Sequence, residues 1–344
     1  MLLDRQNPHG GDIYTHRGVL DFSSNINPFG TPEAVRQAVS EAAAHLSAYP
    51  DPYCRELVGA LSAYEELPAE MILCGNGAAE LIYSFAYALP KKEKALIVSP
   101  TFSEYASALA AAGIAYEHFM LREENGFRPE IAPEDTLGYS AVFLCSPNNP
   151  TGITVPREQL VRLLETGTRV FADLCFLELT EAPERYELKE LVKAFPNLTV
   201  LKAFTKSFAV PGLRLGYVLC SDPDFLRTMS EKTQCWNVSL PAEKAGVAAL
   251  SCLDFLTASV RFISGERARV SAALSALGVR VFPGEANYLL LYSEAPLYEK
   301  LLDRGILVRD CRNYPGLRPG YYRIAIRTAE ENDRLIAAMK EVLH

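Results

Sequence analysis

The chain has 344 residues, of which 49% are hydrophobic and 22% charged, so it has the composition of an ordinary globular protein with one large domain or two. Its net charge of −8, without any block of basic residues, argues against a nucleic-acid surface. No apolar run reaches membrane-spanning length, and the first residues lack the basic and apolar segments of a secretory signal.

Short apolar strands alternate with amphipathic helices between about residues 70 and 220. Near-continuous apolar strands separated by helices indicate a mostly parallel sheet that is covered on both faces. Right-handed crossovers then bring most strand C-termini to one edge, where ligands bind in open α/β sheets. We expect strands at 71–76, 94–100, 140–147, 169–176, 198–204 and 215–221, with helices at 79–89, 157–167 and 188–195.

The pattern changes after about residue 240. One long helical stretch is expected over 241–277, and a final helix over 329–343. Four short strands are expected between them, which together predict an α+β layer in a second, smaller domain. The first residues contain no long strand and are assigned to the same layer. The expected organisation is therefore a large domain over 45–238 and a small domain made of 1–44 and 239–344.

The eight cysteines do not have the spacing of a metal site or a disulfide framework. None forms a CxxC pair, and most lie in apolar stretches. We expect buried, reduced thiols in a cytoplasmic protein. The cysteines are Cys54, Cys74, Cys145, Cys175, Cys220, Cys235, Cys252 and Cys311.

Three of the predicted strand ends carry residues that bind ligands in other contexts. A Gly-Asn-Gly turn ending at Gly77 leads into a helix that begins near Ala78, and such a turn lets backbone N–H groups approach an anion. Phe102 follows another strand, where an aromatic ring packs in the core or stacks on a ligand. Asn149 lies between turn signals that fix its backbone. Each of these features also occurs in α/β proteins without such a site.

Two further strand ends carry charges in apolar surroundings. Asp173 is flanked by apolar residues on a strand expected to be central, and a buried carboxylate is costly unless it is paired. Lys206 follows an apolar strand, and Arg214 begins the next one. A lysine at a strand end is usually solvated, so only its neighbours can assign it another role.

Taken together, these residues suit one ligand, pyridoxal 5′-phosphate. Its aldehyde needs an uncharged amine, and burial near other cations lowers a lysine pKa enough to supply one. Its ring nitrogen needs a carboxylate partner. Its phosphate needs backbone donors and an arginine.

The order GNG…PTF…NNPTG…D…K…R resembles the fold-type I pyridoxal-phosphate enzymes of the class I/II aminotransferase superfamily. Arg214 lies eight residues after Lys206, as it does in that family. Within the superfamily the chain is most similar to the L-threonine-O-3-phosphate decarboxylase branch of the cobalamin pathway, and next to the histidinol-phosphate aminotransferases. The stretches "HGGDI", "LDFSSNINPFG", "ANYLLL" and "RDCRNYPGL" favour the decarboxylase branch. So does Phe176, where aminotransferases of this group usually have Tyr.

The resemblance implies a role for each cofactor residue. Lys206 would form the covalent link to the aldehyde and move protons at Cα, and Asp173 would pair with the ring nitrogen. Asn149 would bond the ring oxygen, and Phe102 would stack on the ring. The cofactor phosphate would be held by Gly77, Ala78, Thr205 and Arg214. Tyr49 would reach the phosphate of the neighbouring subunit, which implies a homodimer with shared sites.

The resemblance also implies a small phosphorylated amino acid as substrate. Arg309 and Arg323 would bind its anionic ends, with His9 and Asn27 closing over them. The implied reaction converts L-threonine O-3-phosphate to (R)-1-amino-2-propanol phosphate and CO₂. The alternative is an aminotransferase with a histidinol-phosphate-like substrate, which would use the same cofactor residues.

Two positions depart from the family pattern. Ala203 stands where the family usually has Ser or Thr as a phosphate ligand, and Leu174 replaces an acid after the cofactor aspartate, with Cys175 next.

Two other protein classes are disfavoured. A cofactor-fold sensor would carry a DNA-binding segment, and a nucleotide-binding dehydrogenase would need a third glycine that "GNGAAE" lacks.

Overall fold

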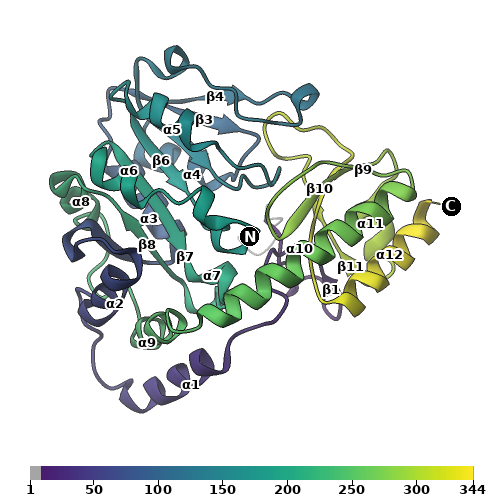
Figure 1. Cartoon of the computed structure of the whole chain (residues 1–344), viewed down its shortest axis with the longest axis horizontal. Coiled ribbons are helices and arrows are strands. Elements are labelled where there is room, and N and C mark those ends of the chain that lie inside the picture. The colour runs from purple at the N-terminus through teal and green to yellow at the C-terminus, as the bar shows by residue number, and fades with distance from the viewer. Residues whose placement is uncertain (1–8, 344) are drawn as a thin grey trace.

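The structure is a computed structural model and describes residues 9–343. A seven-stranded sheet forms its larger part, with strand order β2-β8-β7-β6-β5-β3-β4 (Figure 1). Only β8 runs antiparallel to its two neighbours, which confirms the predicted mostly parallel sheet. The strands are β2 (Ile72–Asn76), β3 (Lys94–Ser99), β4 (Tyr116–Met120), β5 (Tyr139–Cys145), β6 (Arg169–Asp173), β7 (Leu198–Ala203) and β8 (Leu215–Leu219).

Alternate residues of these strands enter two different cores. In β3, Leu96 and Val98 pack into one core, whereas Ala95 and Ile97 pack into the other. A strand directs successive side chains to opposite faces, so this sheet is buried on both sides. The Ala95 face is covered by α3 (Gly77–Ala88), α4 (Glu104–Ala112) and α8 (Pro223–Ser230). The Leu96 face is covered by α2 (Arg55–Glu65), α5 (Arg157–Leu164), α6 (Lys189–Ala194) and α9 (Leu240–Ala249).

The C-terminal part forms a second layer around a four-stranded antiparallel sheet (Figure 1). Phe22, from the N-terminal segment, is buried in the core of this layer. The strands in sheet order are β12 (Arg309–Asp310), β13 (Tyr321–Ala325), β10 (Tyr288–Tyr292) and β9 (Arg280–Val281). The helices are α10 (Leu253–Ala276), α11 (Leu297–Leu302) and α12 (Ala329–Leu343), and β1 (Leu20–Asp21) pairs with β11 (Ile306–Leu307).

The single helix expected over 241–277 is wrong. The chain forms α9 and α10 instead, bent by 75° at the break between them. Ser251 lies in this break, and its hydroxyl donates to the Ala248 carbonyl at 2.7 Å, so a side chain competes for a carbonyl that a continuing helix would use. Among the described residues, no single helix is long and apolar enough to cross a membrane, and α9 and α10 pass that test only as a bent pair, on length and composition.

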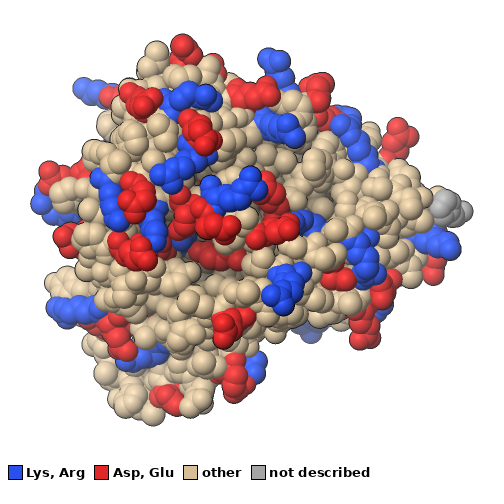
Figure 2. All heavy atoms as spheres, in the orientation of Figure 1, with Lys and Arg blue, Asp and Glu red and all other residues tan. Residues whose placement is uncertain are grey.

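The predicted domain limits at 45 and 238 stay a prediction. Helix α1 (Glu33–Ala42) packs against α9, and α9 also packs against α2 and β8, so these elements lie beside the large sheet. On the face shown in Figure 2, basic and acidic side chains are interspersed, and acidic side chains gather near its centre.

A buried ion cluster lies on β7 just before the strand end. Lys202 is only 3% exposed, and its Nζ lies 3.0 Å from Glu65, 3.0 Å from Glu187 and 3.5 Å from Glu178. The Tyr217 hydroxyl donates to Glu65. Burial raises the pKa of Glu178, and the charge of Lys202 opposes that rise. This one cation therefore compensates three carboxylates beneath the strand.

We predict that Lys202→Met lowers the free energy of unfolding by about 3–5 kcal/mol, because it leaves buried carboxylates unpaired. Urea unfolding measures the change. Lys189→Met is the matched control, since Lys189 pairs with Glu66 at the surface, where an ion pair contributes little. Equal effects of the two substitutions would contradict this view of the cluster.

Candidate active site

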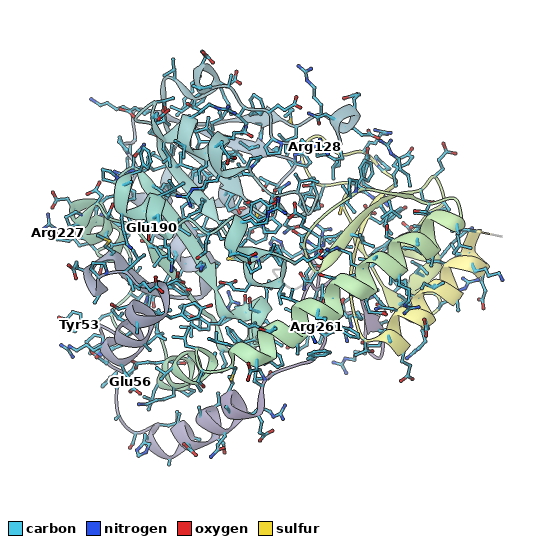
Figure 3. The ribbon with its side chains drawn as sticks, viewed as in Figure 1. Tyr53, Glu56, Arg128, Glu190, Arg227 and Arg261 are labelled. Atoms are coloured by element: carbon cyan, nitrogen blue, oxygen red, sulfur yellow. The ribbon has the colours of Figure 1, made fainter. Side chains whose placement is uncertain are left out.

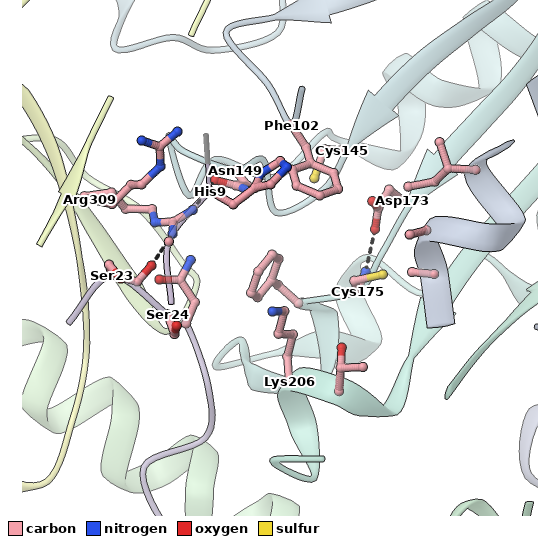
Figure 4. A pocket seen from close by; sticks show the side chains of 18 of the residues that line it. His9, Ser23, Ser24, Phe102, Cys145, Asn149, Asp173, Cys175, Lys206 and Arg309 are labelled. Carbon is pink, nitrogen blue, oxygen red and sulfur yellow. Dashed lines mark hydrogen bonds between the residues drawn. The ribbon is translucent and has the colours of Figure 1, made fainter. Parts of the chain in front are cut away.

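A cavity of about 240 Å³ lies where the parallel strands end. Strands β3, β5, β6 and β7 end at Ser99, Cys145, Asp173 and Ala203, and each passes at once into a segment that lines the cavity. Figure 4 shows Lys206 on one side of this space, Phe102 and His9 on another, Arg309 towards the small sheet and Asp173 towards the large one. The predicted gathering of polar residues at one sheet edge is therefore present.

Lys206 lies in a one-turn helix, α7 (Phe204–Ser207), that directly follows β7. Its Nζ faces the cavity 5.9 Å from the centre of the Phe176 ring. Burial, and then the charges of Arg323 and Arg214, lower the pKa of Lys206 to about 8. A buried amine with such a pKa has a substantial uncharged fraction near neutral pH and can act as a nucleophile.

Asp173 is the last residue of β6 and is buried. The Tyr105 hydroxyl donates to its Oδ2 at 2.6 Å, and the Cys175 N–H donates to its Oδ1 at 3.0 Å. Burial raises the pKa of Asp173, while hydrogen bonds from Cys175 and Tyr105 oppose that rise. The carboxylate is thus fixed in orientation, and its remaining lone pairs can accept another donor.

An anion cradle lies at the start of α3. Gly77 has φ of +77°, and a Cβ built on it would lie 2.5 Å from Nη2 of Arg214. Only glycine therefore lets the guanidinium approach the helix N-terminus this closely. Ala78 and Thr205 line the same end of the cavity. Backbone N–H groups, the helix dipole and an arginine together favour a phosphate.

Asn149 is held by side chains from the C-terminal layer. Its Oδ1 accepts from Arg323 Nη1 at 2.5 Å and from the Tyr314 hydroxyl at 3.2 Å. Arg323 Nη2 donates to the Ser23 carbonyl at 2.6 Å. Because the Asn149 oxygen is occupied, its Nδ2 remains as the donor for a ligand.

His9 and Arg309 enter the cavity from other segments. His9 Nε2 lies 2.9 Å from Glu104 Oε1, and its ring centre lies 5.7 Å from that of Phe102. The Arg309 guanidinium lies 5.2 Å from the centre of the Tyr314 ring. The cavity thus brings together one lysine, three arginines and a histidine with one buried carboxylate.

Most residues predicted from sequence meet in this one cavity. Gly77 lies behind its wall against Arg214. Ala203, which stands where the family usually has Ser or Thr, is buried and is not among the residues that line the cavity. The predicted residues that line it are His9, Ala78, Phe102, Asn149, Asp173, Thr205, Lys206, Arg214, Arg309 and Arg323.

Two predicted residues lie elsewhere. Tyr49 is 79% exposed and stacks on Trp236 with ring centres 4.6 Å apart. Asn27 is buried, and its amide is already used: Nδ2 donates to Ser207 O and to Ser259 Oγ, each at 2.8 Å. Its Oδ1 accepts from the Phe29 N–H. Both amide hydrogens of Asn27 are thus used within the protein, and its expected contact with a substrate stays a prediction.

Asn25 takes the place that sequence reasoning gave to Asn27. It lines the cavity and is 2% exposed, and neither its Nδ2 nor its Oδ1 has a hydrogen-bond partner among residues 9–343. Buried amides are nearly always hydrogen-bonded, so this group is suited to a ligand. The motif "FSSNINPFG" signalled the segment but contains two asparagines, and the sequence does not say which one faces the cavity. Ser23, Ser24, Cys145, Cys175 and Tyr314 also line the cavity and were not predicted as site residues.

Known proteins share this fold. The sequence profile of the class I and II aminotransferases matches residues 17–339. A threonine-phosphate decarboxylase from Salmonella typhimurium is 38% identical over 97% of this chain and 96% of its own. The structure of a histidinol-phosphate aminotransferase from Clostridium acetobutylicum is 30% identical with a TM-score of 0.88, covering 94% of this chain and 99% of that one. A histidinol-phosphate aminotransferase from Sinorhizobium meliloti, solved with pyridoxal 5′-phosphate, is 22% identical with a TM-score of 0.87, covering 99% of this chain and 96% of that one.

The chain therefore belongs to the class I and II aminotransferase family. Its fold is the fold-type I architecture of that family, and the family's cofactor is pyridoxal 5′-phosphate. The resemblance found in the sequence is confirmed, both for the family and for the similarity to threonine-phosphate decarboxylase.

We predict that the cofactor-free protein takes up pyridoxal 5′-phosphate at a rate that rises with pH up to about 8 and then levels off. The uncharged amine is the reacting form, and with a pKa of about 8 roughly a tenth of Lys206 is uncharged at pH 7, some 300-fold more than for a lysine of ordinary pKa. Stopped-flow absorbance measures the rate. A rate still rising tenfold per unit between pH 9 and 10 would show that the amine is not perturbed.

Proposed function

We propose that this protein is a pyridoxal-phosphate-dependent decarboxylase that converts L-threonine O-3-phosphate to (R)-1-amino-2-propanol phosphate and CO₂, a reaction of cobalamin biosynthesis. The observation that carries the proposal is the 38% identity to a threonine-phosphate decarboxylase over nearly the whole chain. Ten of the site residues in that proposal line one cavity, which adds support from geometry.

The residues fit the cofactor. The cavity has a buried lysine of lowered pKa and a buried carboxylate, which match the aldehyde and the ring nitrogen. The glycine at 77 leaves room for a guanidinium beside a helix N-terminus, which matches the phosphate. Phe102, Asn149 and Thr205 all line the cavity. In this proposal Phe102 would cover the ring and the Asn149 Nδ2 would bond the ring oxygen. Thr205 would offer a hydroxyl to the phosphate, which Ala203 cannot.

When bound, pyridoxal 5′-phosphate withdraws electrons from the Cα atom of an attached amino acid, which weakens the bonds at that carbon. Asp173, oriented by Tyr105 and by the Cys175 N–H, would keep a proton on the ring nitrogen. Lys206 would hold the aldehyde in the resting enzyme. Its amine would carry to Cα the proton that takes the place of CO₂, so that the product is an amine.

The substrate's two anionic groups require several donors. Arg309 and Arg323 provide positive charge around the cavity, and Arg323 Nε has no hydrogen-bond partner within residues 9–343. The His9 ring also lines the cavity. The Asn25 amide is likewise without a partner in that range. We propose that the substrate phosphate and carboxylate fill these positions, because buried polar groups left unbonded are costly.

A decarboxylase must hold the Cα–carboxylate bond perpendicular to the cofactor ring, whereas an aminotransferase must hold the Cα–H bond there. Phe176 favours the first reaction within this family, since it replaces a tyrosine that donates to the ring oxygen in the related aminotransferases. Its ring packs edge-on against Tyr288, with centres 5.1 Å apart. The alternative, an aminotransferase of a histidinol-phosphate-like substrate, is favoured by the TM-score of 0.88 to such an enzyme.

We propose further that the protein is a homodimer whose subunits share their active sites. Tyr49 is exposed beside Trp236 and lies outside its own cavity, as a residue that serves a neighbour would. Tyr53 is 69% exposed and projects from the same edge as Glu56 (Figure 3). Exposed aromatic side chains are typical of subunit interfaces.

The eight free thiols suit a cytoplasmic location.

We predict that the purified protein with pyridoxal 5′-phosphate releases CO₂ from L-threonine O-3-phosphate in equal amount to the amine formed. The assay measures CO₂ and, with 2-oxoglutarate present, keto acid. Lys206→Ala is the control and should abolish turnover, because the amine that moves the proton is gone. Keto acid formed without CO₂ would contradict the decarboxylase and support the aminotransferase.

A further inference from the structure

The helix that carries Lys206 is too short to be stable through its own hydrogen bonds. Helix α7 has four residues, Phe204–Ser207, and its last carbonyls lack partners within the helix. One isolated turn is unstable without outside contacts. Two of those contacts come from Asn27, far away in the sequence. Its backbone N–H donates to the Lys206 carbonyl at 3.1 Å, and its Nδ2 donates to the Ser207 carbonyl at 2.8 Å.

The Asn27 amide also connects this helix to α10. The second Nδ2 hydrogen goes to Ser259 Oγ at 2.8 Å, and Oδ1 accepts from the Phe29 N–H at 3.1 Å. Both hydrogens of the amide are thereby used, and Asn27 is 2% exposed. Hydrogen bonds at such a buried position are costly to lose, because no water replaces them.

The same N-terminal segment holds the turn that follows Lys206. Thr31 Oγ1 donates to the Ala209 carbonyl at 2.7 Å. Ala209 has φ of +51°, which is unfavourable for a residue with a Cβ and needs support from its surroundings. On the other side of α7, Ser207 Oγ lies 3.3 Å from Glu178 Oε2 in the buried ion cluster. The turn is thus held from both sides.

We propose that Asn27 is a positioning residue for Lys206, whose two hydrogen bonds to α7 set where the amine stands in the cavity. The inference rests on the proposed function, in which Lys206 is the residue that binds the cofactor and moves the proton. A displacement of about 1 Å at such a group is enough to slow a reaction about a hundredfold. Asn27 itself does not line the cavity. Its hydrogen bonds to α7 connect it to Lys206, which does.

The test is Asn27→Asp, which keeps the shape but replaces the donating NH₂ by an oxygen that the Ser207 carbonyl repels. In the holoenzyme we expect kcat to fall about 10- to 100-fold, with KM for threonine phosphate changed less than about threefold. The pH midpoint of the cofactor's visible absorbance should rise by about half a unit or more. Part of that rise would come from the charge of the new carboxylate, so the uncharged variant Asn27→Ser is titrated beside it.

Ser259→Ala is the matched control, because it removes the bond between Asn27 and α10 but leaves both bonds from Asn27 to α7. It also removes the bond from Ser259 Oγ to the Phe255 carbonyl within α10. We expect it to retain the wild-type midpoint and kcat. A fall in thermal stability in Asn27→Asp, with midpoint and kcat both unchanged, would overturn the proposal and leave Asn27 a purely structural role. Asn27→Ser shortens the side chain and adds no charge, so a smaller shift in the same direction is expected from displacement of the amine alone. No shift in Asn27→Ser overturns the proposal.

The outcomes also separate this inference from the function it rests on. A wild-type protein without the visible band, or a band that survives Lys206→Ala, would overturn the proposed function and the inference with it. A normal wild-type band that Lys206→Ala removes, together with an unchanged titration in Asn27→Asp, overturns the inference alone.

Discussion

The burial of the Lys206 amine among other cations is the constraint on which the site depends. Taking an ammonium group out of water disfavours its charged form, and Arg323 and Arg214 add repulsion, so the pKa falls to about 8. The same arginines are also placed to bind anions: Arg214 beside the helix N-terminus and Arg323 across the cavity. One set of charges therefore lowers the lysine pKa and is also suited to anionic ligands. Asp173, at the end of the neighbouring strand, supplies the opposite charge at the other side of the cavity.

The fold makes this arrangement possible by joining distant segments at one sheet edge. Strands β6 and β7 deliver Asp173 and the helix of Lys206 from neighbouring positions in the sheet. The small sheet supplies Arg323, which donates to Asn149 in the turn after β5. The N-terminal segment supplies Asn25 to the cavity and Asn27 to the lysine helix. Placement of the amine thus depends on contacts from three parts of the chain.

The sequence predicted the features that depend on local pattern. Apolar runs define the strands, parallel topology brings their ends together, and so Asp173, Asn149 and Lys206 meet where expected. The sequence-based predictions failed where contacts between distant residues determine the structure. β4 is an edge strand with half-exposed side chains and no continuous apolar run, and the break at Ser251 depends on one hydroxyl. The choice between Asn25 and Asn27 depends on α7 and α10, which lie far away in the chain.

The covalent bond between Lys206 and the cofactor is the central claim, and chemical trapping tests it most directly. Purified holoprotein is reduced with borohydride, digested and analysed by mass spectrometry. The account predicts a peptide in which Lys206 alone carries the reduced cofactor, together with loss of the visible absorbance. The cofactor found on another lysine, such as Lys202, or on none, would contradict it.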